Sequence, residues 1–339
     1  MPEEPESTER LIAPIAVEYT PPPETRTDEE ISRFLLEVIE DHGLNGENIR
    51  IENGLVRVDL TEPYPLGATG SIETFQEHQR HSHWEPILYQ PELGADVMAM
   101  TVPLPKEYAY KGGTARWLLQ RELGLDFEPS PSDIDIIKHG RPESEQGREE
   151  DPLFAILAPD DAVRGIKMEV VGSLETHVYK VEFAMNEVLA TNHELIATPQ
   201  CVIDNVQGVI RVSGYEEANG GVRNSVVARA LRFYTQKMCR GEMPTIKGIP
   251  EEKLYEPHPE SFGYCSQLDR MARDGYPHET IAFIRVLRTF GHLPQKTRSV
   301  EEAAEYFYSH LPDGKHYEFL NIFTPSNQAK IGLLPEWDY

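Results

Sequence analysis

The sequence predicts an α+β protein, with a mixed sheet flanked by helices and a C-terminal bundle of helices. Three patterns lead to this prediction. A helical pattern runs directly into a hairpin pattern between residues 29 and 60, and the order strand, turn, helix, strand follows at residues 108–138. The last hundred residues then show the helical period in three successive segments.

The first elements are a helix and a hairpin. A helix over residues 29–41 is predicted by apolar residues at the spacing i, i+3, i+4, i+7, namely Ile31, Phe34, Leu35, Val38 and Ile39. His42-Gly43 ends it. The segment NIRIENGLVRVDL then alternates apolar and polar residues on both sides of Asn53-Gly54, a dipeptide that favours a tight turn between two strands.

Length and charge limit the kind of protein. With 339 residues and 39% hydrophobic residues, the chain can form two or three compact units. No apolar stretch is long enough to cross a membrane and no leader pattern is present, so we expect a cytoplasmic protein without a membrane partner. The net charge of −25 argues against a large non-specific surface for nucleic acid, although one local stretch is basic: Arg223, Arg229, Arg232, Lys237 and Arg240.

Histidines and cysteines give weaker signals. The segment between Pro63 and Asp96 has no clear period and is interpreted mainly as loop, and it contains three histidines: His78, His81 and His83. They lack a carboxylate or cysteine partner at a recognised spacing, so solvated side chains are favoured over a metal site. Three widely spaced cysteines (Cys201, Cys239 and Cys265) indicate reduced thiols.

A glycine turn lies at the centre of the chemistry. In YAYKGGTARWLLQRELG, Gly112 and Gly113 follow a predicted strand and open a predicted helix. Glycines allow the backbone to approach a ligand closely, and the N–H groups that open a helix favour an anion. A phosphate group is the expected ligand, and Arg116, one turn into the helix, offers it a charged fork.

Two aspartates follow on the next predicted strand. In SDIDII, Asp133 and Asp135 are two residues apart, so an extended strand directs both carboxylates to one face while Ile134 and Ile136 face a core. Two nearby carboxylates repel each other unless a cation or a proton offsets their charge. Divalent metal, Mg²⁺ or Mn²⁺, would neutralise them and also the charge of a triphosphate.

These motifs resemble a known family. GGTARWLL followed by SDIDII is similar to the head of the polymerase-β-type nucleotidyltransferases, in particular the class II CCA-adding tRNA nucleotidyltransferases and the related bacterial poly(A) polymerases. Three later segments resemble the family's in the same order: KVEFAMNEVLATNHELI (RRDFTxNAxAxD), VIDNVQGVIRV (hDPxGGxxDLxxxxIR) and NSVVARALRFYTQKM (RAxRFA). Together they cover about residues 108–238.

The resemblance implies roles for individual residues. Gly112, Gly113 and Arg116 would bind the triphosphate, and Asp133 and Asp135 would ligate metal. The family's nucleotide pocket would include Glu182 and Asn186, and its paired arginines would be Arg229 and Arg232. Glu169, in the apolar segment IKMEVV, would be the third carboxylate that many members of the superfamily place on a neighbouring strand; a solvent-facing strand glutamate is the alternative.

Some positions depart from the family. Lys180-Val181 stand where the family has a double arginine, and Trp117 stands where it has an aspartate at the mouth of the pocket. The base-reading element EDxxR is absent, because its positions fall on Val222-Arg223 and Val226. About a hundred residues follow the RAxRF helix, which shortens the family's tRNA-binding body.

The C-terminal segments predict helices that pack together. YCSQLDRMARDG, HETIAFIRVLRTFGHLP and SVEEAAEYFYSHLPDG each have an apolar face at helical spacing, and their aromatic residues are expected in a core: Phe283, Phe290, Tyr306 and Phe307. Ser299 and Glu302 suggest a capping box. His278 and His292 flank helix ends and are expected to act as caps.

The sequence therefore predicts four parts. They are a disordered acidic, proline-rich tail (1–28), a helix-hairpin module (29–100), a polymerase-β-like nucleotidyltransferase domain (101–215) and a helical domain (216–339). The expected activity is transfer of a nucleoside monophosphate from an NTP to a hydroxyl, with tRNA or another RNA 3′ end as acceptor. The alternatives are a protein or small-molecule acceptor, or a non-catalytic nucleotide-binding homologue.

Overall fold

A computed structural model of the chain describes residues 27–44, 46–60, 106–125, 135–145, 147–149, 168–218, 221–259, 262–273 and 277–311. These residues form two compact units. The sheet unit comprises the described residues of Pro21–Gln207 and Val212–Gly221, and the helical unit comprises Gly208–Arg211 and the described residues of Val222–Tyr339. The expectations for the tail before residue 27, for Asp133 and for the three histidines (His78, His81 and His83) lie outside the described residues.

The first helix and hairpin are confirmed. Helix α1 (Asp28–Asp41) begins with a capping box, in which Thr27 and Glu30 bond each other's backbone N–H groups. Strands β1 (Ile49–Glu52) and β2 (Leu55–Asp59) pair antiparallel. The turn residues Asn53 and Gly54 both have positive φ, 53° and 75°, as the tight hairpin turn predicted from this dipeptide requires.

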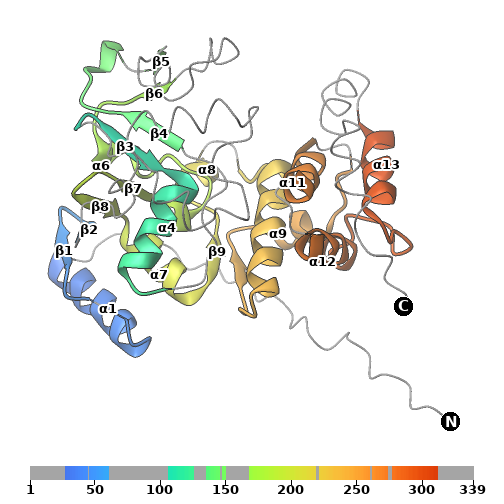
Figure 1. Cartoon of the computed structure of the whole chain (residues 1–339), viewed down its shortest axis with the longest axis horizontal. Coiled ribbons are helices and arrows are strands. Elements are labelled where there is room, and N and C mark those ends of the chain that lie inside the picture. The colour runs from blue at the N-terminus through green and yellow to red at the C-terminus, as the bar shows by residue number, and fades with distance from the viewer. Residues whose placement is uncertain are drawn as a thin grey trace, which may run out of the picture. The chain divides into compact units, whose positions relative to one another are not determined.

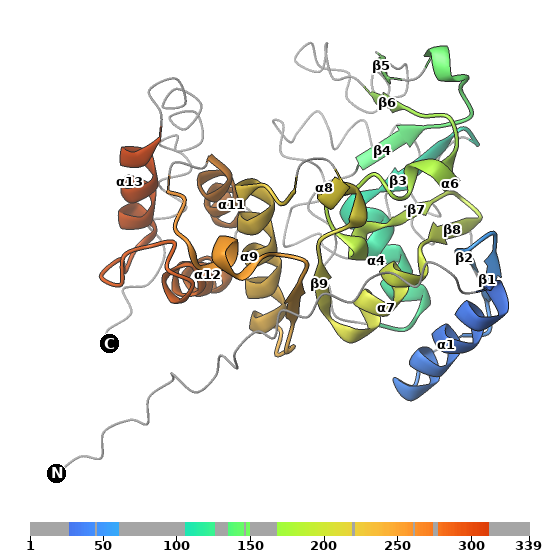
Figure 2. The ribbon, with the colours of Figure 1, turned by 180° about the vertical axis from the view of Figure 1, so that it is seen from behind.

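One mixed sheet organises the sheet unit, as the sequence predicted. Its order among the described strands is β1-β2-β8-β7-β3-β4-β6-β5, and neighbours pair antiparallel apart from the parallel pair β4 and β6. Figures 1 and 2 show the β1–β2 hairpin at one edge and β5 with β6 at the other. The further strands are β3 (Tyr108–Lys111), β4 (Asp135–Lys138), β5 (Gly147–Glu149), β6 (Met168–Val170), β7 (Val188–Ala190) and β8 (Glu194–Ala197).

The helices of this unit are mostly short. They are α4 (Gly112–Glu122), α6 (Leu174–His177), α7 (Pro199–Gln207), α8 (Gly214–Ala218) and the 3₁₀ turns η3 (Glu143–Glu145) and η5 (Ala184–Asn186). The predicted order strand, glycine turn, helix, strand is thus present as β3, α4 and β4.

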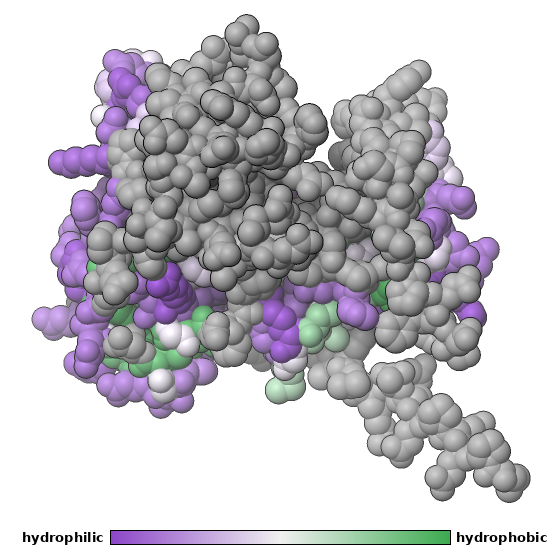
Figure 3. Space-filling view, in the orientation of Figure 1, coloured by the Kyte–Doolittle hydropathy of each residue, from purple (hydrophilic) through white to green (hydrophobic). Residues whose placement is uncertain are grey.

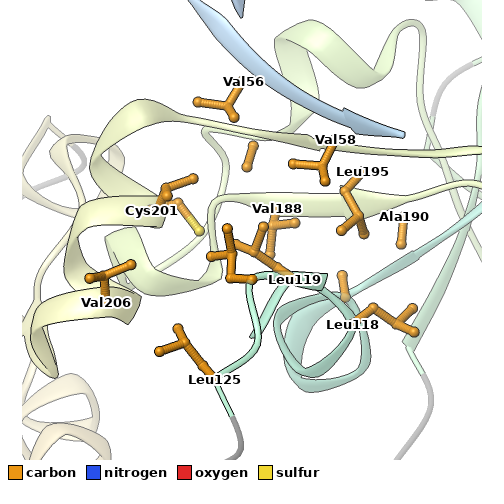
Figure 4. Packing of buried hydrophobic residues seen from close by; sticks show 14 of the residues in the cluster. Val56, Val58, Leu118, Leu119, Leu125, Val188, Ala190, Leu195, Cys201 and Val206 are labelled. Atoms are coloured by element: carbon orange, nitrogen blue, oxygen red, sulfur yellow. The ribbon is translucent and has the colours of Figure 1, made fainter. Parts of the chain in front are cut away.

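Alternate strand residues face two separate apolar cores. The core on the α4 face of the sheet is covered by α1, α4 and α7, and its strand residues include Val56, Tyr110, Ile136, Val188 and Leu195. Figure 4 shows Leu118 and Leu119 of α4 in this core, with Cys201 and Val206 of α7. The core on the α6 face contains Leu174 and Val178 with Leu55, Ala109, Ile137, Leu189 and Ile196. Because side chains alternate along a strand, each residue of the central strands is assigned to one of these faces.

The helix-hairpin segment belongs to the same compact unit as the glycine turn. The sequence interpretation separated residues 29–100 from residues 101–215, whereas the structure pairs β2 with β8, with Val56 opposite Ala197. Helix α1 adds Leu35 and Ile39, both fully buried, to the core on the α4 face. A two-stranded hairpin is marginal alone, and here it gains its apolar partner from the larger sheet.

The predicted C-terminal helices are present in the helical unit. It contains α9 (Asn224–Cys239), α10 (Glu251–Tyr255), α11 (Phe262–Arg273), α12 (Pro277–Thr289), α13 (Val300–His310) and the parallel pair β9 (Val209–Arg211) and β10 (Thr245–Lys247). Phe283, Phe290 and Phe307 are buried as expected, and Tyr306 is half-buried. Tyr264 stacks on Phe307 with ring centroids 5.5 Å apart, so aromatic packing joins α11 to α13.

One predicted cap differs in detail. Ser299 accepts the backbone N–H of Glu302 at 3.2 Å, as predicted. The carboxylate of Glu302, however, accepts the N–H of Arg298 at 2.6 Å, one residue before the cap. In a full capping box, the Glu302 carboxylate would accept the backbone N–H of Ser299; here it accepts the N–H of Arg298 instead.

Three of the five basic residues at α9 are buried or paired within the helical unit: Arg232, Lys237 and Arg240. Arg232 and Lys237 are buried, with 6% and 3% of their surface exposed. The Arg232 guanidinium lies 4.6 Å from the centroid of the Phe233 ring, and Glu242 pairs with both Lys237 (2.7 Å) and Arg240 (3.0 Å). These arginines and this lysine support packing within the helical unit.

The described surface in the view of Figure 3 is mostly hydrophilic. Among the described residues, no helix is long and apolar enough to cross a membrane.

His292 joins three elements of the helical unit. Its backbone N–H caps α12 by donating to Leu287 O at 2.8 Å, so the predicted capping role is present. Its buried ring also makes two hydrogen bonds. Nε2 lies 2.7 Å from Leu254 O, and because a carbonyl oxygen only accepts, Nε2 must carry the proton. Nδ1 is then unprotonated and accepts a hydrogen bond from the Tyr264 hydroxyl at 3.0 Å. Burial lowers the pKa of His292 to about 4.

This arrangement predicts acid sensitivity. The unfolded chain binds a proton at His292 below about pH 6.5, whereas the folded chain binds it only near pH 4. Stability from this site is therefore complete above pH 6.5 and falls by up to about 1.4 kcal/mol per pH unit as the pH is lowered through that window. Urea unfolding between pH 7.5 and 4.5 should show a shallower dependence for His292→Gln than for the parent. His278→Gln, at an exposed histidine, is the control, and equal slopes for His292→Gln and the parent would contradict the assignment.

Candidate functional site

The glycine turn and Asp135 touch each other at the end of β3. The register of β3 and β4 puts Lys111 directly opposite Asp135, and the next residue, Gly112, begins α4 with φ of +62°. A Cβ at Gly112 would lie 2.8 Å from Asp135 Oδ2. Only glycine combines this backbone conformation with room for the carboxylate, so the two predicted motifs form one structural feature.

A third predicted residue, Glu169, lies on the same face of the sheet. In β3 and β4, the neighbours Ala109 and Ile137 belong to the core on the α6 face, so alternation directs Lys111 and Asp135 to that face as well. Glu169 of β6 lies beside Ile137 in the parallel pair. Its carboxylate accepts a bond from Lys111 Nζ at 2.5 Å. Glu169 thus stands on the neighbouring strand, where the sequence interpretation expected a third carboxylate.

His177 is a buried member of this group that the sequence interpretation did not select. It ends α6, is 4% exposed, and its Nε2 lies 3.8 Å from Glu169 Oε1. Burial lowers the pKa of His177, and the negative charge of Glu169 opposes that effect. No recognised motif includes this histidine, because only the fold of α6 against the sheet brings it to Glu169.

Arg116 and Asn186, both predicted to bind nucleotide, contact each other. The Arg116 guanidinium on α4 donates to Asn186 Oδ1 on η5, although the two residues are 70 positions apart in the sequence. Arg116 is 7% exposed, and a buried guanidinium requires such polar partners. The structure therefore brings the segments GGTARWLL and KVEFAMNEVLATNHELI together.

A buried amide network holds η5 beside α4 and α7. Asn205 of α7 donates to Met185 O at 3.0 Å and to Cys201 O at 2.8 Å, and its Oδ1 accepts from Gln120 of α4 at 2.8 Å. The buried Cys201 thiol also donates to Met185 O, at 3.3 Å, and burial raises its pKa well above the usual value. This thiol is therefore a packing group rather than a nucleophile.

Three further residues were predicted to bind nucleotide: Glu182, Arg229 and Arg232. Glu182 is half-buried, and its carbonyl accepts the Ser213 N–H at 2.9 Å beside the bridge between Phe183 and Val212. Arg229 and Arg232 lie on α9 in the helical unit, and Arg232 is buried there.

Trp117 packs against the core of the sheet unit. It is partly buried against the core on the α4 face, and the Arg121 guanidinium lies 5.7 Å from the centroid of its ring. The tryptophan therefore extends the packing of α4.

The residues at the glycine turn suit a hard divalent cation. Asp135 and Glu169 supply carboxylate oxygens, the ligands that Mg²⁺ and Mn²⁺ prefer, and the absence of a Cβ at Gly112 leaves room at Asp135 Oδ2. Asp133 lies outside the described residues, and within the described part of the chain no group of three potential metal ligands is assembled.

No protein-family model matches the chain, and a search of curated proteins found no match.

The contact at Gly112 predicts a specific pattern of mutant stability. Gly112→Ala adds both backbone strain and a collision with Asp135, whereas Gly124→Ala adds strain alone, because φ there is +77° and nothing lies within 4 Å of the new Cβ. Because Asp135 is exposed and its Oδ2 is the free end of a side chain, Gly112→Ala should cost only up to about 1 kcal/mol more than Gly124→Ala in urea unfolding. In an Asp135→Ala background the difference should disappear; a difference that persists there would show that Asp135 is not the colliding group.

The amide network predicts a second result. Asn205→Leu leaves the Gln120 amide and Met185 O without these bonds in a buried site, and should lower the free energy of unfolding by roughly 2–4 kcal/mol. Gln207→Ala, which removes an exposed amide from the end of the same helix, should cost less than about 1 kcal/mol. The double variant Gln120→Leu/Asn205→Leu should lose less than the sum of the single variants, as measured by a double-mutant cycle, and simple additivity would contradict the network.

Proposed function

We propose that this protein is a metal-dependent nucleotidyltransferase that moves a nucleoside monophosphate from an NTP to a hydroxyl, with an RNA 3′ end such as that of tRNA as the acceptor. The observation that carries the proposal is the contact of Asp135 with the Gly112 turn. It puts a carboxylate beside the opening of a helix that favours phosphate, which is the pairing that phosphoryl chemistry needs.

Position supports the proposed roles of the other residues. Gly112 and Gly113 open α4, so that its first N–H groups are available to a phosphate. Arg116, held by Asn186, adds a positive charge one turn into the same helix. Glu169 adds a second carboxylate on the face that carries Asp135.

The chemistry of the site follows from charge. Bound Mg²⁺ or Mn²⁺ would neutralise the triphosphate and lower the pKa of the attacking hydroxyl. Asp135 and Glu169, together with Asp133, would hold that ion, and the opening of α4 would orient the phosphates for in-line attack. Pyrophosphate is the leaving group. The role implied for Glu182, which lies in the same compact unit, remains part of this proposal, whereas Arg232 is buried within the helical unit.

The departures from the family bear on the base and the acceptor. EDxxR is absent, and Lys180-Val181 replace the double arginine. Val181 is half-buried, and its carbonyl accepts a hydrogen bond from the Ser213 hydroxyl. We therefore assign this residue to the support of the bridge between Phe183 and Val212, and not to nucleotide binding. We therefore propose transfer without assigning the base.

A labelling experiment tests the proposal. Purified protein is incubated with each of four α-labelled NTPs, Mg²⁺ or Mn²⁺ and total tRNA, and a gel separates labelled RNA from labelled protein. Label is expected on RNA. Label on the protein would instead assign polypeptide as the acceptor, and nucleotide binding without any label would support a non-catalytic homologue.

The Asp135→Asn variant sharpens this test. Its labelling should fall roughly 100-fold or more, because even the loss of an outer partner of a metal ligand costs 10–100-fold. Its metal-free stability should hold or rise, because one of the repelling charges is removed. Asp41→Asn, at an exposed aspartate that ends α1, makes the same charge change and should keep full activity. Full labelling by Asp135→Asn would refute the proposed site.

A further inference from the structure

Lys111, like His177, is a residue of this site that no motif assigns. It is the N-cap residue of α4, with an extended backbone (φ −133°, ψ −177°), and its side chain makes no capping bond. Its ammonium instead reaches across β4 to Glu169 on β6, at 2.5 Å. A positive charge therefore lies on the face that carries both described carboxylates.

We propose that Lys111 is a phosphate-binding residue, and that the Lys111–Glu169 pair separates when nucleotide and metal bind: phosphate takes the ammonium and metal takes the carboxylate. This inference rests on the proposed function for the identity of the ligand. The exchange itself requires less than the proposed function does, because it requires only that the site binds a triphosphate group and a divalent cation.

The exposure of the pair makes this exchange possible. The side chains of Lys111 and Glu169 are 28% and 36% exposed, so water and ions reach both partners. An ion pair in contact with solvent contributes little net stability, and a phosphate or a metal ion can replace either partner. A fully buried pair would resist exchange, because separating it would leave a charge without a partner in the interior.

The location of Lys111 favours phosphate over other anions. The residue immediately precedes the N–H groups that open α4, so one phosphate chain can contact the helix opening and the ammonium together. Asp135, directly opposite Lys111 in the register, is a ligand for the metal that would accompany this phosphate. Both kinds of group are thus supplied at a single turn of the chain.

Electrostatics then couples the two ligands. A divalent cation bound at Glu169 while Lys111 remains nearby would be repelled by the ammonium, and a phosphate bound at Lys111 would be repelled by Glu169. Each ligand removes the obstacle to the other, so their binding is reciprocally strengthened. In the resting protein, the pair therefore weakens binding of either ligand alone.

Two variants distinguish exchange from a purely structural bridge. Lys111→Met leaves Glu169 without its cation, so Mn²⁺ should bind roughly three- to tenfold more tightly while inorganic triphosphate binds more weakly by a similar factor. Glu169→Gln should do the reverse, weakening Mn²⁺ and strengthening triphosphate. A structural bridge would weaken both ligands in both variants, through loss of order, or would leave both unchanged.

The measurements are separate calorimetric titrations of the full chain, one with Mn²⁺ alone and one with inorganic triphosphate in EDTA, which prevents the two ligands from forming a complex with each other. Lys106→Met, at an exposed lysine before β3, is the matched control and should change neither affinity. Lys111→Arg should retain both. Thermal melts check that each variant is folded.

The outcomes separate the two proposals. Opposite shifts in Lys111→Met and Glu169→Gln would support exchange, whether or not the labelling experiment detects transfer. Parallel or absent shifts would overturn it, even if labelling succeeds. Absence of triphosphate binding by both the parent protein and Glu169→Gln would overturn the exchange, whereas the proposed transfer is tested separately by the labelling experiment.

Discussion

The close approach of Gly112 to the Asp135 carboxylate is the constraint on which the site depends. Strand β3 must end where α4 begins, and the register of β3 with β4 fixes which side chain meets that junction. A side chain at Gly112 would separate the helix opening from the carboxylate. Because the junction contains no side chain, the backbone N–H groups and the carboxylate can serve one ligand, in line with the way helix openings bind phosphate.

The two faces of the sheet carry different kinds of side chain. The α4 face holds the larger core, to which α1, α4 and α7 each contribute buried side chains. The α6 face has a smaller core and carries the charged group of Lys111, Asp135, Glu169 and His177. Strong packing on one face holds the strands in register, and that register places the charged side chains on the other face. Rigid elements, rather than loops, therefore position the described carboxylates.

Several of the described lysines and arginines of this acidic chain are paired with carboxylates or buried. In the described residues of the helical unit, Lys237 and Arg240 pair with Glu242, and Arg232 is buried over Phe233. In the sheet unit, Lys111 offsets Glu169. An RNA acceptor would have to be recognised without these α9 residues as a free cationic surface, since phosphate-backbone affinity depends on available lysines and arginines. Local recognition of a 3′ end is more consistent with this charge distribution than binding along a duplex.

The sequence by itself determined the local elements: helix α1, the Asn53-Gly54 hairpin, the β3–α4–β4 order and the C-terminal helices. Short-range spacing and turn chemistry are enough for these. Tertiary structure alone decided that the hairpin joins the main sheet, that Arg116 meets Asn186 and that Lys111 and His177 surround Glu169. These contacts join residues that are distant in the sequence, and only strand register and packing bring them together, which periodicity within one segment does not encode.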